Sequence, residues 1–220
     1  MSMAATKRKP LSRERILAAA LALVDEQGIE ALSMRRLGQA LGFEAMSLYN
    51  HVASKDDLLD GILDLVLAEM EPPPPDGGLP AIRRSAVAAH EALQRHAWAA
   101  HLLMAPGRVR VARLDYMEAL LACLRGAGFS ADTTYHAYHV VDAHIVGFSL
   151  WQAGHAAAPA HVEDMREWFE RMIPVDRFPH LHEHGLQHLD DGPHRAVSAF
   201  EFALDLLLAS LEKLRETASA

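Results

Sequence analysis

The sequence predicts an all-α protein, and three observations favour that class. Apolar residues recur at steps of three and four along most of the chain, which is the spacing of amphipathic helices. Glycine and proline fall between these stretches, where helices are expected to end. No stretch alternates convincingly between apolar and polar residues, so strands are not expected. With 220 residues, half of them hydrophobic, the chain can bury a large core in one or two domains.

Charge is distributed unevenly along the chain, whose net charge is -8. Residues 1–55 hold eight Lys or Arg and five Asp or Glu, whereas the remainder holds 13 basic and 24 acidic residues. A large acidic body repels phosphate and leaves the basic N-terminal segment as the surface suited to a nucleic acid.

The cysteine content and the N-terminus favour a cytoplasmic protein. Cys123 is the single cysteine, so no internal disulfide can form, and we expect this side chain to be a small buried apolar group. Residues 1–10 lack the apolar segment of a signal peptide, and no apolar run approaches the roughly 20 residues that span a bilayer.

The first helix is expected to begin after Ser12, an N-cap residue, and to end at Gly28. Leu11 and Ile16 are spaced as a hydrophobic staple across this start. Residues 1–10 form a basic arm that is either a solvated tail or a contact to the DNA backbone or minor groove.

Residues 33–58 have the outline of a helix-turn-helix. Ser33 caps a short amphipathic run that closes at Gly42, and a second run after a three-residue turn carries polar side chains outward. We therefore predict a three-helix DNA-binding domain over residues 11–55, whose last helix enters the major groove. An ordinary αα-corner is the alternative, because short helices joined by a glycine turn are common.

A connecting helix is predicted over about residues 54–70. Ser54 caps it, and Asp56 and Asp57 suit the positive end of its dipole. The proline run at 72–75 and the glycines that follow break the helix, and we place them in a loop within a larger helical domain, residues 56–220. Later helices are expected at roughly 80–104, 108–125, 131–153, 160–172 and 194–216.

The last predicted helix carries apolar residues at steps of three and four, which is the seam of a bundle or coiled coil. The predicted helix at 131–153 has a comparable stripe. Two such helices from each subunit would form a four-helix dimer interface, whereas the alternative is an intramolecular core. The residues expected at the interface are Val141, Phe148, Phe200, Leu204, Leu207 and Leu211.

Five of the 14 histidines crowd residues 180–194, which we expect to be a loop. Such a cluster could bind zinc or nickel and make the protein a metal-sensing regulator, but neighbouring acidic residues equally suit a solvated segment. We expect neither a metal nor a cofactor. An enzyme that uses His and Cys123 is a further alternative, and we predict no enzyme because the chain has no nucleophile elbow, phosphate loop or HExxH motif. The five histidines are His180, His182, His184, His188 and His194.

Residues 12–62 resemble the DNA-binding signature of the tetracycline-repressor (TetR) family of bacterial transcriptional regulators. The resemblance rests on the run GIEALSMRRLGQALGFEAMSLYNHVASKDDLLDGI, which includes Gly42, the segment 48–52 and Lys55. The remainder matches more loosely, in length, helix order and the closing run FEFALDLLLASLE, which looks like the tetracycline-repressor branch.

The resemblance implies which residues contact DNA. Arg35 is expected on a guanine edge or a phosphate, residues 45–47 on base edges, and Tyr49, His51 and Lys55 on phosphates. Tetracycline repressors commonly carry polar residues where this chain has Ala45 and Met46, so its operator sequence should differ from theirs. The full predicted set is Ser33, Arg35, Ala45, Met46, Ser47, Tyr49, Asn50, His51 and Lys55.

The resemblance also implies a repressor that binds a palindromic operator as a homodimer and is released by a small molecule of unknown identity. The effector would bind in the helical body and move the connecting helix, which is a coupling between two sites. Aromatic or polar residues that interrupt apolar helix faces are the expected ligands: His101, Met104, Tyr116, Tyr138, His139, Asp142, Trp151 and Trp168.

Overall fold

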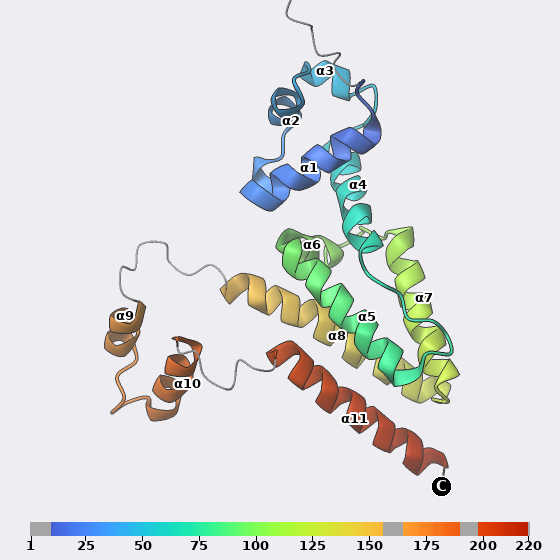
Figure 1. Cartoon of the computed structure of the whole chain (residues 1–220), viewed down its shortest axis with the longest axis vertical. Coiled ribbons are helices and arrows are strands. Elements are labelled where there is room, and N and C mark those ends of the chain that lie inside the picture. The colour runs from blue at the N-terminus through green and yellow to red at the C-terminus, as the bar shows by residue number, and fades with distance from the viewer. Residues whose placement is uncertain (1–9, 156–164, 190–197, 220) are drawn as a thin grey trace, which may run out of the picture. The chain divides into compact units, whose positions relative to one another are not determined.

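The computed structural model describes residues 10–155, 165–189 and 198–219. Within these ranges the chain is helical and contains no strand, as the sequence predicts (Figure 1). The helices are α1 (Arg13–Gln27), α2 (Met34–Leu41), α3 (Ala45–Leu48), α4 (Lys55–Ala68), α5 (Gly78–Arg95), α6 (Ala97–Leu103), α7 (Val111–Gly126), α8 (Ala131–His155), α9 (Met165–Met172), α10 (Pro179–Leu189) and α11 (Ala199–Ser219), with a short 3-10 helix at Ile29–Ala31.

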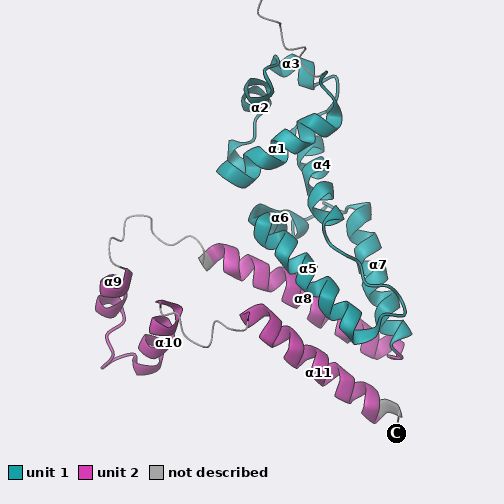
Figure 2. Cartoon of the chain, in the orientation of Figure 1, with its two compact units in different colours: residues 1–127 teal, residues 128–220 magenta. Residues whose placement is uncertain are grey.

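The chain divides into two compact units, Met1–Ala127 and Gly128–Ala220 (Figure 2). The first unit contains α1 to α7, and the second contains α8 to α11. The first unit therefore holds the predicted DNA-binding helices together with the connecting helix α4. The assignment of residues 11–55 to DNA binding and of residues 56–220 to regulation stays a prediction.

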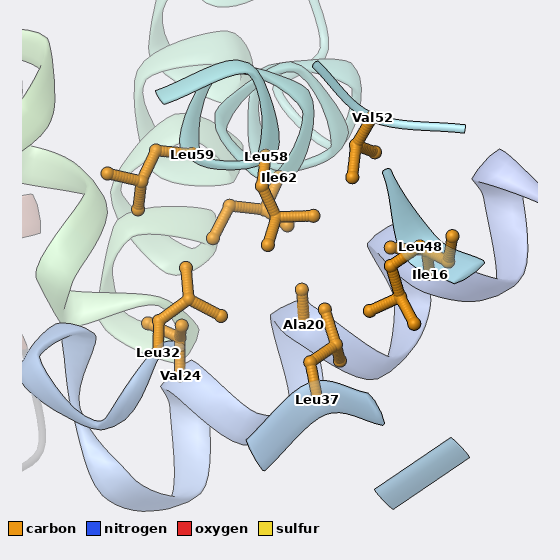
Figure 3. Packing of buried hydrophobic residues seen from close by; sticks show 10 residues of the cluster. All are labelled: Ile16, Ala20, Val24, Leu32, Leu37, Leu48, Val52, Leu58, Leu59 and Ile62. Carbon is orange, nitrogen blue, oxygen red and sulfur yellow. The ribbon is translucent and has the colours of Figure 1, made fainter. Parts of the chain in front are cut away.

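A small apolar core holds α1 to α4 together. Its side chains come from three turns of α1, from α2, α3 and the first half of α4, and from the segments just before α2 and just after α3 (Figure 3). Trp98 and Leu102 of α6 pack against the same core, so the N-terminal helices continue into the rest of the first unit. The core residues are Ile16, Ala20, Val24, Leu32, Leu37, Leu48, Val52, Leu58, Leu59 and Ile62.

The turn between α2 and α3 depends on two glycines. Gly42 adopts a left-handed conformation, with φ of 74°, and its N–H donates to the carbonyl of Gln39. The N–H of Phe43 donates to the carbonyl of Gly38 at 2.9 Å, which completes a Schellman motif. A Cβ at Gly38 would lie 2.7 Å from the carbonyl oxygen of Phe43, so the turn needs glycine there as well.

In the remainder of the first unit, α5 packs against α6 and α7, and α4 packs against all three. Ser85 of α5 donates a buried hydrogen bond of 3.0 Å to the hydroxyl of Tyr116 of α7. The predicted helix at 80–104 is wrong in one respect, because the chain breaks at His96, where φ is −122° and ψ is 60°. The break separates α5 from α6, and the two helices run in different directions (Figure 1).

In the second unit α8 packs against α11, and α9 against α10. The imidazole of His144 stacks on the ring of Phe200 at 4.5 Å, and its Nε2 lies 2.9 Å from the carbonyl oxygen of Phe200. The loop predicted over residues 180–194 is wrong over its described part, because Pro179–Leu189 is helical. Phe169 of α9 packs on Gly185, so α10 has a buried side, which the polar sequence of this segment did not predict. His194 lies outside the described residues.

Candidate nucleic-acid interface and effector site

The short helix α3 has one buried and one exposed side. Leu48 is fully buried in the N-terminal core, and it anchors the helix there (Figure 3). Met46 is 75% exposed and Tyr49 is 47% exposed, whereas Ala45 and Ser47 are half-buried. Exposed apolar groups of this size on a short polar-flanked helix suit contact with base edges and the sugar-phosphate backbone.

Polar and cationic residues flank this exposed side. Arg35 is exposed in the first turn of α2, and Lys55 is exposed as the first residue of α4. Asn50 is exposed and His51 half-buried in the turn that leaves α3. Ser33 is engaged as the α2 cap, since its Oγ accepts the N–H of Arg36 at 3.3 Å. The nine predicted DNA contacts therefore lie within one segment, residues 33–55, and their roles stay predictions.

The side chain of Arg13 connects α1 to α4 and to the turn that follows α3, and no sequence pattern predicted this contact. Its guanidinium forms two hydrogen bonds with the carboxylate of Asp57, at 2.7 and 2.9 Å, and a third with the carbonyl of His51 at 3.1 Å. The hydrogen bonds from Arg13 to the Asp57 carboxylate hold the pKa of Asp57 at about 2, with help from the N–H of Ala53. No local pattern could reveal the contact, because Arg13 and Asp57 are 44 positions apart.

A second charged cluster joins α4 to the loop that precedes α7. Arg108 pairs with Asp56 at 3.3 Å and also with Asp60. Arg110 pairs with Asp60 at 3.1 Å and binds Asp64 through two nitrogens, and the bond to Asp64 raises the pKa of Arg110. The three aspartates lie four residues apart on one side of α4. We call these five residues the arginine–aspartate ladder.

A third polar cluster surrounds His96. Its Nδ1 lies 2.8 Å from Asp25 of α1, and its Nε2 lies 3.1 Å from Glu69 at the end of α4. Trp98 donates to the same Asp25 oxygen at 2.7 Å, and Arg95 binds Glu69. Burial opposes ionisation of Glu69, but the hydrogen bonds from Arg95 and His96 keep its pKa below the usual value. The corner between α5 and α6 is thus tied to both α1 and α4.

The predicted effector ligands differ in exposure and fall in both units. In the first unit, His101 and Met104 are exposed near the end of α6, and Tyr116 is buried beside Ser85. The first unit also contains a cavity of about 200 Å³ between α4 and the loop before α7, and none of the predicted ligands lines it. Of the ligands predicted in the second unit, Tyr138 is buried, Asp142 and Trp168 are half-buried, and His139 and Trp151 are exposed. The effector site stays a prediction.

Most residues predicted for the dimer interface are buried within the single chain. Val141, Phe200, Leu204 and Leu211 are buried, whereas Phe148 and Leu207 are half-buried. They therefore have little surface left for a second copy, and the contact of His144 and Phe148 with Phe200 shows that this stripe packs α8 against α11. The dimer and the residues of its interface stay predictions.

Among the described residues, no three His, Cys, Asp or Glu side chains gather closely enough to hold a metal ion. The Nε2 atoms of His184 and His188 lie 3.2 Å apart on α10, and Nδ1 of His182 lies 2.6 Å from the carbonyl oxygen of Ile173.

Cys123 is buried, and burial raises the pKa of its thiol, as expected for a structural cysteine. None of the described helices is long and apolar enough to cross a membrane.

Two family models match the chain. Residues 16–62 match bacterial regulatory proteins of the tetR family, and residues 71–215 match the tetracyclin repressor-like C-terminal domain. This chain belongs to the TetR family. Family membership confirms the prediction of a ligand-responsive DNA-binding transcriptional repressor, and also the prediction that the protein is not an enzyme.

Individual members of the family are similar over most of the chain. The HTH-type transcriptional repressor DrrR1 of Streptomyces coeruleorubidus is 30% identical over 93% of this chain and 78% of its own length. The class D tetracycline repressor of Escherichia coli is 31% identical over 92% of this chain and 89% of its own. The TetR family protein ActR of Streptomyces coelicolor, solved in complex with actinorhodin, aligns with a TM-score of 0.69 and 26% identity over 94% of this chain and 99% of its own.

Proposed function

We propose that this TetR-family chain binds a palindromic operator as a homodimer, through α3 and the residues around it, and is released when a small molecule binds its helical body. The exposed side of α3 carries this proposal, because Met46 and Tyr49 project from a helix whose other side is fixed in a core. Arg35 and Lys55 place positive charge at the starts of the two neighbouring helices. Amide groups at those starts favour phosphate as well.

The homodimer is supported by a second apolar side on α11. Phe202 and Leu206 are 60% and 57% exposed, and they lie on the side of the helix opposite Leu204, which is buried. A helix that is apolar on two sides needs a second partner. We propose that this partner is a second copy of the chain, because a reader as short as α3 requires two half-sites.

The neighbouring helix α8 offers a complementary surface for the same contact. Val140 and Trp151 are exposed on it, and Ala143 and Gly147 lie exposed between them. Small residues at such positions allow two helix backbones to approach closely. We propose that the exposed sides of α8 and α11 from two copies form the four-helix interface, in a cytoplasmic protein.

Operator binding can be tested with the DNA that adjoins the gene for this chain. The dissociation constant should rise steeply with salt, because phosphate contacts release counterions. Lys55→Ala should weaken binding and flatten the salt dependence, whereas Arg84→Ala, which removes an exposed arginine from α5, should change neither. Binding that does not respond to salt, or equal effects of both variants, would contradict the proposed interface.

The effector can be sought by thermal stabilisation, since a ligand that binds the folded state raises its apparent stability. Actinorhodin and tetracycline are the first compounds to test, because similar proteins are described with them. An effector should raise the melting temperature and also lower the affinity for the operator. A compound that stabilises the protein without affecting DNA binding would not be the effector.

A further inference from the structure

The geometry around Arg13 points to a positioning residue for the DNA reader. Arg13 is the first residue of α1, but its side chain leaves that helix to contact the segment between α3 and α4. The guanidinium donates to both carboxylate oxygens of Asp57 and to the carbonyl of His51. A planar fork can make this arrangement, whereas the single ammonium of lysine cannot.

Both acceptors belong to one short stretch of chain. The carbonyl of His51 lies just beyond the end of α3, and Asp57 lies in the first turn of α4. Asp57 further accepts the N–H of Ala53 at 2.8 Å, and its own N–H donates to Ser54 Oγ at 3.1 Å. Arg13 therefore contacts both ends of the segment 51–57, and the carboxylate of Asp57 also binds the N–H of Ala53 within it.

We propose that Arg13 and Asp57 set the orientation of the recognition helix relative to α4, and that they act through the segment 51–57 without touching DNA. The segment is flanked by predicted DNA contacts, with Tyr49 before it and Lys55 within it. A small rotation of this turn would turn α3, and with it the predicted base contacts at residues 45–47, relative to Lys55. This inference rests on the proposed DNA interface. It holds that Arg13 and Asp57, which lie outside that interface, determine how the interface is oriented.

A direct phosphate contact by Arg13 is the competing explanation, and it predicts different results. Were Arg13 a phosphate ligand, Arg13→Lys would keep the charge and most of the affinity. Asp57→Asn would then strengthen DNA binding, because it removes a negative charge beside that ligand. A positioning pair predicts that both changes weaken operator binding, so the sign of the Asp57→Asn effect separates the two explanations.

The test measures the affinity of the full-length protein for operator DNA and for a scrambled duplex of equal length. We expect Arg13→Lys and Asp57→Asn each to weaken operator binding by about tenfold, the size of one lost charge-assisted hydrogen bond. Affinity for scrambled DNA should stay nearly constant, because the phosphate-facing charges remain. The double variant should lose little more than either single variant, since both remove one shared contact.

Arg84→Lys is the matched control, because Arg84 is exposed on α5 and the exchange is chemically the same. All variants are measured well below their unfolding temperatures, and a general loss of structure would weaken binding to both duplexes equally. Equal losses on both duplexes, or unchanged operator binding by Arg13→Lys, would overturn the inference. Failure of the wild-type chain to bind its operator would instead refute the proposed function.

Discussion

Removing both arginines from the arginine–aspartate ladder should destabilise the protein by an amount that depends on salt. The double variant Arg108→Gln, Arg110→Gln leaves three aspartates one turn apart on α4 without their cations. The arginine side chains are only 19% and 27% exposed, so their pairs with Asp60 and Asp64 are shielded in part from water. Asp56 is 81% exposed, and its pair with Arg108 should contribute almost nothing.

The expected loss follows from these contacts. Two partly shielded ion pairs contribute about 0.5–1 kcal/mol each to the free energy of unfolding. The aspartates left behind repel one another at i, i+4 spacing, which costs about 0.2–0.5 kcal/mol for each adjacent pair. Together the double variant should lose about 2 kcal/mol in low salt, which lowers the melting temperature of a chain this long by about 4–8 °C.

Salt distinguishes this electrostatic origin from lost packing. Near 1 M salt the screening length falls to about 3 Å, so most of the difference between the variant and the wild type should disappear. Urea unfolding followed by circular dichroism, at matched protein concentration in low and high salt, measures both values. Arg84→Gln serves as the control for removing an exposed arginine. A loss that is equal at both salt concentrations, or no loss in low salt, would refute the reasoning.

Three further predictions concern the interface, the turn and the pH dependence. Phe202→Glu with Leu206→Glu should convert the dimer to monomers in sedimentation experiments, and a variant that remains dimeric would exclude this side of α11. Gly38→Ala should lower the free energy of unfolding by about 1–3 kcal/mol, because its Cβ would meet the carbonyl oxygen of Phe43, and an unchanged urea midpoint would contradict this. Asp57 has a folded pKa of about 2, so its stabilisation is present above the unfolded pKa near 4 and is lost as the pH falls toward 2. Its partial exposure reduces that contribution to about 1 kcal/mol, and the difference between wild type and Asp57→Asn should therefore vanish in acid.

The N-terminal helices could be predicted because their signals are local. Ser12, Ser33 and Ser54 each accept an N–H three residues later, which confirms the three predicted caps. Gly42 takes the left-handed conformation that its place after an amphipathic run predicts. Each of these features depends on residues within one helical turn, and such spacing can be read directly from a sequence.

The contacts that orient the reader could not be predicted in this way. Arg13 and Asp57 meet only after α1 and α4 pack, and nothing in either segment specifies the other as a partner. The break at His96 could not be predicted either, because the apolar residues on both sides of it keep helical spacing. At the break the imidazole of His96 contacts Asp25 and Glu69, which are distant in the sequence. Distant polar partners determine these features, whereas apolar periodicity reports only local structure.

The apolar seam of α11 shows how one pattern can suit two different partners. The steps of three and four predicted a helix that packs along one stripe, and Phe200 and Leu204 lie buried on that stripe. The same pattern suits a contact within the chain or between chains, and periodicity cannot distinguish them. Phe202 and Leu206 are exposed on the opposite side of α11, and the contact with a second copy is therefore proposed there.

Helix α4 connects these observations because three clusters of charge meet on it. Arg13 binds Asp57 in its first turn, the arginines of the arginine–aspartate ladder bind aspartates along it, and His96 contacts Glu69 just beyond its end. A displacement of α4 would therefore strain contacts to α1 and to the loop before α7 at once. Because Lys55 and the segment 51–57 are continuous with α4, such strain would reach the predicted DNA contacts without any change within α3 itself. A signal from the body needs only to shift the balance among these polar contacts, which lies within the 1–3 kcal/mol typical of coupling between sites.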